Sequence, residues 1–179
     1  MFLSGVIDKA GRLNRSLNTP RIRDGEHGPE YLFATADQQA GVPDDVVLTE
    51  VDIANLLRAK GAIYAGFSVL TRSVGISLAD VEQVLIGGSF GKYINIEKAI
   101  TIGLLPDMPW ERFRYLGNTS VRGAYQVLLS RELRRELTEI AQRMTYLELS
   151  ADNSFMEEFT SALFLPHTDE TAFPSVAKL

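Results

Sequence analysis

The residues best suited to chemistry in this sequence form a glycine-rich turn directly after an apolar run. Val84-Leu85-Ile86 leads into Gly87-Gly88-Ser89-Phe90-Gly91, which places three glycines within five residues. Glycine permits backbone at positive φ and the close approach of a ligand. A short helix is predicted over residues 94–100, and a strand, a glycine turn and a helix in succession favour a nucleotide or another anionic group at the turn. Because a strand also ends in glycines for purely steric reasons, both interpretations stay open.

The same turn has the Gly-x-Ser-x-Gly form of a nucleophile elbow, in which a serine lies between a strand and a helix. Asp107 or Asp152, and then His167, follow Ser89 in the chain order of a hydrolase triad. However, no oxyanion loop of the His-Gly-Gly type precedes Ser89, and too few strands are predicted before it. A serine hydrolase with Ser89 as nucleophile is therefore a minor alternative.

Lys60 is the second candidate residue. It lies in the middle of a predicted long helix, among the small residues Ala59, Gly61 and Ala62 and near the apolar face of that helix. A lysine in this position either extends to solvent along its apolar stem or reaches a ligand. The residues themselves do not decide between these two roles.

Composition excludes several kinds of site and partner. The chain has no cysteine, so disulfides and cysteine-ligated zinc or iron–sulfur centres within it are excluded. Its two histidines, His27 and His167, are far apart in the sequence, and no P-loop or Gly-x-Gly-x-x-Gly motif occurs. We therefore expect no metal site in this chain.

Charge and hydropathy narrow the class of protein further. The net charge is −5, from 23 acidic and 18 basic residues, which argues against general nucleic-acid binding. The sequence shows neither an apolar run of the length that a membrane span needs nor the pattern of a secretory signal. We expect no membrane association and a cytoplasmic location.

The pattern of apolar residues predicts strands that alternate with helices. Strands are expected at residues 31–34, 46–48, 84–86, 113–116 and 145–149. Helices are expected from Thr49 to Gly75 and at residues 77–80, 94–100, 120–129, 131–144 and 153–163. Residues 9–30 are predicted to be a loop, and the chain from His167 onward is predicted to be loose.

This alternation indicates an α/β fold with a mixed or parallel sheet. Ligands bind such sheets at the carboxyl ends of the strands. Two predicted strands end in glycine-bearing turns, Gly87–Gly91 and Gly117–Asn118. We expect these two turns to line one crevice.

Several short segments, taken in order, resemble one protein family. They are Asp52-Ile53 with Ala59-Lys60-Gly61-Ala62-Ile63, then Ile86–Gly91, Ile102-Gly103-Leu104-Leu105-Pro106, Gly117-Asn118-Thr119-Ser120 and Leu149-Ser150-Ala151-Asp152. Together they resemble the C-terminal part of the reductive activators of corrinoid proteins. The resemblance extends from about Gly5 to His167 and is more specific than the glycine turn alone.

The resemblance implies an α/β, ribonuclease-H-like (actin-like) lobe with a mixed sheet flanked by helices, as in the superfamily of acetate and sugar kinases, heat-shock chaperones and actin. In that superfamily a nucleotide lies in a cleft between two lobes. The residues that it assigns to the adenosine side of the nucleotide are Gly87, Gly88, Ser89, Gly91, Lys60 and Asn118. One position departs from the chaperone pattern, because Leu57 stands where an acidic or amide side chain precedes the lysine by one turn.

The resemblance also implies a parent protein with an iron–sulfur, ferredoxin-like domain and an upstream nucleotide-binding lobe. Such a parent uses ATP and Mg²⁺ to drive the return of Co(II) corrinoid proteins to Co(I). Its partners are the corrinoid protein and its own upstream domains, with a homodimer as a further option. This sequence contains neither the phosphate loop of the first lobe nor cluster cysteines, so we expect no ATP hydrolysis by the chain alone.

The domain organisation follows from the same resemblance. Residues 1–45 are expected to be a lead-in from an upstream lobe plus a loop, residues 46–167 the C-terminal nucleotide-binding lobe, and residues 168–179 a loose tail. Two alternatives stay open beside the activator and the serine hydrolase. One is the C-terminal lobe of a small-molecule kinase or activase of the same superfamily, and the other is a binding module without catalysis.

Overall fold

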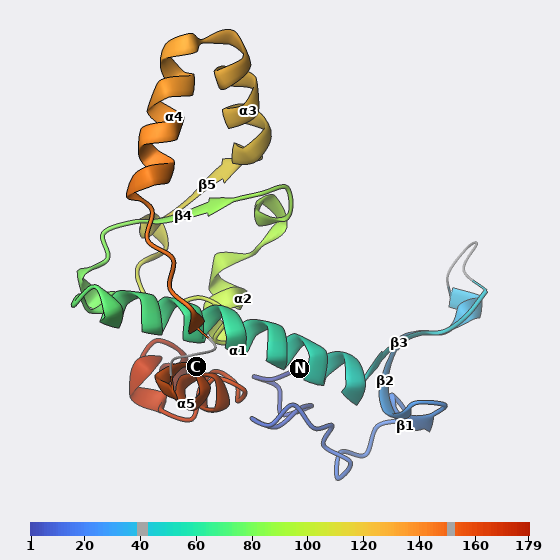
Figure 1. The fold of residues 1–179 in the computed structure, drawn as a ribbon. Helices are drawn as coiled ribbons and strands as arrows, with labels where there is room; N and C mark the ends of the chain where they lie inside the picture. The colour runs from blue at the N-terminus through green and yellow to red at the C-terminus, as the bar shows by residue number, and fades with distance from the viewer. Residues whose placement is uncertain (39–42, 150–152) are drawn as a thin grey trace.

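A computed structural model describes residues 1–38, 43–149 and 153–179 (Figure 1). Its strands are β1 (Ile22–Gly25), β2 (Gly28–Ala34), β3 (Val46–Thr49), β4 (Val84–Gly87) and β5 (Phe113–Gly117). Its α-helices are α1 (Glu50–Ser73), α2 (Ile96–Thr101), α3 (Thr119–Leu129), α4 (Arg131–Arg143) and α5 (Asn153–Ser161). Short 3₁₀ turns cover Ala36–Gln38, Leu78–Asp80, Phe90–Tyr93, Trp110–Arg112, Glu170–Ala172 and Val176–Lys178.

Helix α1 is the longest element, and its limits follow from its end residues. The Thr49 hydroxyl accepts a hydrogen bond from the Asp52 N–H at 3.1 Å, and the Asp52 carboxylate accepts one from the Thr49 N–H at 3.0 Å. This capping box satisfies two backbone donors at the start of the helix. Gly75, with φ at +73°, supplies the left-handed residue that follows its end. The predicted long helix from Thr49 to Gly75 is confirmed.

One face of α1 packs on α5. An added Cβ at Gly61 would lie 3.3 Å from the backbone oxygen of Ala162, just after α5. The glycine therefore allows α1 and the end of α5 to approach closely, which offsets its cost of about 1 kcal/mol in a helix interior. Figure 1 shows α5 lying beneath α1.

The strands form two sheets in the described part of the chain. β1, β2 and β3 form an antiparallel sheet in that order, and β4 pairs with β5 in parallel. The α/β class is confirmed. The sheet of β2 and β3 crosses the domain boundary that was predicted after residue 45.

The prediction of a loop over residues 9–30 is wrong for its last third, where β1 and β2 form a hairpin. Gly28, with φ at +96°, closes the turn between the strands. Arg23 on β1 donates to Glu30 on β2 and to Asp45, both at 2.8 Å. Polar cross-strand pairs hold this hairpin, so it lacks the apolar alternation that identifies a strand in a sequence.

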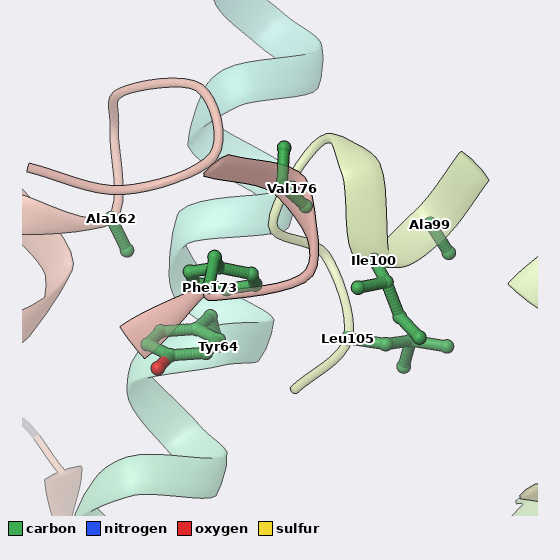
Figure 2. Close-up of a cluster of buried hydrophobic side chains, with 7 residues drawn as sticks. All are labelled: Tyr64, Ala99, Ile100, Leu105, Ala162, Phe173 and Val176. Atoms are coloured by element: carbon green, nitrogen blue, oxygen red, sulfur yellow. The ribbon is translucent and has the colours of Figure 1, made fainter. Parts of the chain in front are cut away.

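The main core lies between α1, α2 and the C-terminal segment (Figure 2). Tyr64 of α1, Ile100 of α2 and Phe173 of the C-terminal segment are buried side by side in it, and Phe173 has no exposed surface. The prediction of a loose tail over residues 168–179 is therefore wrong. The few apolar residues of that segment do not follow the spacing of a helix or a strand, so the sequence pattern did not indicate their burial.

The predicted strand over residues 145–149 is also wrong. Residues 145–148 belong to no helix or strand, and the Tyr146 hydroxyl donates to the Glu148 carboxylate at 2.6 Å on the surface. The alternation of apolar and polar residues is present, but none of the described residues pairs with this segment as a strand. Ser150, Ala151 and Asp152, including the carboxylate considered for a hydrolase triad, lie outside the described residues.

Helices α3 and α4 form a hairpin that rises from β5, away from α1 and α5 (Figure 1). The Arg134 guanidinium of α4 donates to the carbonyls of Val127 and Leu128 at the end of α3, at 3.1 and 3.4 Å. A cation at a helix C-terminus also interacts favourably with the helix dipole. These hydrogen bonds join α3 to α4 at the turn between them, where Ser130 also caps α4.

Candidate functional site

The carboxyl ends of β4 and β5 lie together and carry the two glycine turns. Gly87 pairs with Gly117 in the parallel register, and the Gly88 N–H donates to the Gly117 carbonyl at 2.8 Å. The turns Gly87–Gly91 and Gly117–Asn118 are therefore adjacent. That they line one crevice stays a prediction.

Gly88 is the residue of the turn that only a glycine fits and that leaves space beside it. Its φ is +104°, a conformation that other L-residues rarely adopt. Apart from Gly88 itself and its two chain neighbours, no described residue has an atom within 4 Å of the position that an added Cβ would take. The backbone at Gly88 is therefore open to a ligand.

The neighbouring glycines have steric reasons of their own. A Cβ at Gly87 would lie 2.8 Å from the Thr119 hydroxyl oxygen. A Cβ at Gly91 would lie 2.6 Å from a methyl group of Ile86 and 3.0 Å from the Tyr115 ring. The steric interpretation of the glycine turn therefore applies to Gly87 and Gly91, which serve packing. Gly88 leaves a surface free, and ligand binding there stays a prediction.

The two polar residues of the turns, Asn118 and Ser89, differ in their structural roles. The Asn118 side chain accepts a hydrogen bond from the Val121 N–H at 3.1 Å and caps α3. Ser89 precedes the Phe90–Tyr93 turn without capping it through its side chain. Asn118 thereby fixes the start of α3 beside the glycine turns.

Tyr115 and Thr119 lie against the glycine turn and were missed by sequence reasoning. The Tyr115 hydroxyl donates to the Gly88 carbonyl at 3.1 Å and so holds the turn from β5. Thr119 presents its hydroxyl next to Gly87. Both assignments depend on the register between β4 and β5, which shifts at Ile86 and Gly87, and the sequence does not give that register.

The partners of a serine hydrolase are engaged elsewhere. His167 packs against the rings of Tyr64 and Phe173, and its Nδ1 accepts a hydrogen bond from the Asp169 N–H at 3.0 Å. Asp107 accepts hydrogen bonds from the backbone and the hydroxyl of Ser175, at 2.7 and 2.8 Å. Neither residue is available to activate Ser89, so this geometry does not support the hydrolase alternative.

Lys60 occupies a place that neither sequence interpretation described. Its side chain has no exposed surface, and its ammonium donates to the carbonyls of Phe164 and of Pro166, the latter at 2.7 Å. Burial lowers the pKa of Lys60 from 10.5 to about 7. In this conformation the lysine extends neither to solvent nor to a ligand, because it joins the middle of α1 to the segment after α5.

Among residues 1–38, 43–149 and 153–179, no three or more His, Asp and Glu side chains are placed to hold a metal. No helix in this described part of the chain has the length and apolarity for a bilayer span. Phe90 and Tyr93, just after the glycines, expose most of their aromatic surface.

The chain is similar to a known protein family and to several known proteins. Residues 1–177 match the family described as the C-terminal domain of RACo, the ASKHA domain. The chain is 36% identical over 165 residues to the corrinoid activation enzyme RamQ of Eubacterium limosum, an alignment that covers 89% of the chain and 28% of RamQ. It is 29% identical over 112 residues to the reductase of the Co(II) methylated amine-specific corrinoid protein of Methanosarcina barkeri, with 62% of the chain and 21% of the reductase covered.

A solved structure agrees with these relatives. The reductive activator for corrinoid, iron–sulfur protein superposes with a TM-score of 0.90 at 50% sequence identity, over 98% of this chain and 28% of that protein. The chain thus spans less than a third of the length of the proteins that it matches.

Proposed function

Because this chain belongs to the family of C-terminal ASKHA domains of RACo, we propose that it is the nucleotide-binding C-terminal lobe of a reductive activator of corrinoid proteins. The activator transfers one electron from an iron–sulfur cluster to the Co(II) of a corrinoid protein, which gives Co(I). The cluster belongs to a domain outside this chain, which has no cysteine. All of the relatives described above act on corrinoid proteins by their names, which favours this function over a small-molecule kinase.

The open backbone of Gly88 carries the proposal for the site. A nucleotide at the ends of β4 and β5 would approach Gly88 and lie between Gly87, Ser89 and Gly91 on one side and Asn118 on the other. A base or ribose there would meet no Cβ at Gly88. Lys60 is not part of this site, because its ammonium is buried against backbone carbonyls.

ATP and Mg²⁺ would be bound by this lobe together with the upstream lobe. This chain would supply the adenosine side, and acidic and glycine-rich elements of the other lobe would supply the metal and phosphate side. Nucleotide binding would change the relative stability of the conformations of the activator, and thereby its affinity for the corrinoid protein. A cytoplasmic location is part of the same proposal.

Replacing Gly88 with valine is expected to weaken ATP binding by an activator that carries this domain at least about tenfold, equivalent to about 1.4 kcal/mol. The branched side chain would occupy the open space at the turn, and the positive φ of Gly88 would strain it. Isothermal titration calorimetry with ATP measures the effect.

Gly75→Val is the matched control for this variant. Gly75 also has a positive φ, +73°, and no described atom within 4 Å of an added Cβ, but it lies after α1. Gly75→Val should therefore carry a similar backbone strain and leave ATP affinity unchanged. Equal ATP affinity in the folded Gly88→Val protein and in the control would remove the nucleotide from this turn.

A further inference from the structure

Helix α3 exposes several large apolar side chains. Of its residues Thr119–Leu129, Arg122 alone is charged, and every one is at least partly exposed. Val121, Tyr125 and Leu128 follow a spacing of four and three residues and form an outer apolar face, on which Leu128 is 74% exposed. A row of exposed large apolar side chains is typical of an interaction surface, so we expect the outer face of α3 to be covered by a partner.

A second apolar surface lies between α3 and α4. The groove there has a volume of about 600 Å³ and is lined from α4 by Leu133, Leu137 and Ile140. On the α3 side Ala124 and Val127 face it. We call this groove and the outer face of α3 together the hairpin surface. It has two sides, and nothing in residues 1–38, 43–149 and 153–179 covers either of them.

Strand β4 also has one face that is uncovered in the described part of the chain. Val84 is buried and Ile86 packs against the main core, whereas Leu85, which points to the other face of the sheet, is 55% exposed. Parallel sheets are normally covered on both faces. The layer formed by β4, β5 and α3 therefore has one covered side and one uncovered side.

The occupant must cover α3 on two sides. A second copy of the hairpin related by a twofold axis would bury one self-complementary face and leave the other exposed. The proteins that this chain matches are more than three times its length, since the alignments cover 28% of them. The remainder of the activator is therefore a partner large enough to cover both sides of α3.

We propose that the hairpin surface is the interface through which this domain binds the part of the reductive activator that the chain does not span. This proposal depends on the proposed function for one point only, which is the identity of the partner that covers the surface. It holds the domain against the rest of the activator through apolar contacts on α3 and α4, apart from the nucleotide turn at Gly88.

Hydrogen–deuterium exchange tests the interface. Amide exchange over residues 119–143 is measured in the chain alone and in the activator that contains this domain. We expect exchange at least about tenfold slower in the activator, because covered helices open less often. Equal exchange in the two proteins would overturn the proposal.

Charged substitutions identify the two sides of the surface. Leu128→Glu on the outer face and Leu137→Glu in the groove should each restore fast exchange in the activator, because each places a carboxylate in an apolar interface. Gln142→Glu, on exposed α4 outside the groove lining, adds the same charge and should leave the protection intact. Loss of protection in all three variants alike would contradict a specific surface.

A second copy is a separate outcome. If light scattering shows that the chain alone is a dimer, and Leu128→Glu makes it monomeric, the hairpin surface is a dimer interface and the proposal is wrong. ATP affinity is measured in the same variants. An intact interface with no ATP binding would contradict the proposed nucleotide site and leave the interface standing.

Discussion

Replacing Gly103 with alanine is expected to lower the free energy of unfolding by about 3–5 kcal/mol, the largest effect of any single methyl group considered for this chain. Gly103 follows α2 and has φ at +75°. Its added Cβ would overlap the Pro166 carbonyl oxygen, lie 2.8 Å from the Pro166 carbonyl carbon and lie 3.1 Å from the Lys60 ammonium. Because the obstacle is backbone, neither rotation of a side chain nor a small shift relieves it.

Gly75→Ala separates the backbone strain from the overlap. Gly75 has nearly the same φ, +73°, with open space around it, so alanine there should cost only the left-handed conformation, about 1–2 kcal/mol. Urea unfolding followed by circular dichroism measures both variants. A loss at Gly103 no greater than the loss at Gly75 would show that the Pro166 segment yields to the added methyl group.

Helices with strong end signals could be predicted from the sequence, because the signals are local. Thr49 and Asp52 form the capping box that opens α1, and Asn95 and Asn118 cap α2 and α3 through their side chains. Each bond joins residues three positions apart. A pattern of that length is visible in the chain before it folds.

Elements that depend on distant partners could not be predicted in the same way. Phe173 is buried by Tyr64, more than a hundred positions away, so the burial of the C-terminal segment has no local sign. The reverse error occurred at residues 145–149, where local alternation was present and no neighbouring strand met it. Strand pairing is a property of two segments, and one segment alone does not reveal it.

In the candidate site, too, some features could be predicted from the sequence, and others depend on distant residues. The meeting of the two glycine turns followed from the general rule that parallel strands end at one edge of a sheet, and the structure agrees. The roles of Gly87 and Gly91 depend on Thr119 and Tyr115 across the sheet. The sequence alone therefore did not show whether these glycines serve packing or ligand binding. The ammonium of Lys60 is bound by the backbone carbonyls of Phe164 and Pro166. Every residue type carries a backbone carbonyl, so the sequence does not show which ones bind the lysine.

The buried ammonium of Lys60 should make the chain more stable as the pH rises from 7 to 9. Burial lowers the pKa of Lys60 to about 7 in the folded chain, whereas it returns to about 10.5 on unfolding. Between these values the unfolded chain binds more protons than the folded chain, so raising the pH favours folding. The gain over this range is about 2 kcal/mol. Below pH 7 both states are protonated, and the full penalty of burying the charge is present.

Lys60→Met is the variant that isolates this effect. Methionine is an unbranched apolar side chain that fills much of the same space and does not titrate. Its free energy of unfolding should change little between pH 7 and 9, while that of the unaltered chain rises. The other ionisable groups near Lys60 do not account for the rise. Burial lowers the pKa of the neighbouring His167 below its usual 6.5, so it stays neutral throughout.

Urea unfolding at pH 7, 8 and 9 in both proteins gives the comparison, with each protein referred to its own value at pH 7. A rise of about 2 kcal/mol in the unaltered chain that Lys60→Met removes would show that an ammonium is buried against Phe164 and Pro166. The same rise in both proteins would assign it to other groups. A flat profile in the unaltered chain would mean that Lys60 reaches water, and would return the lysine to the surface or to a ligand.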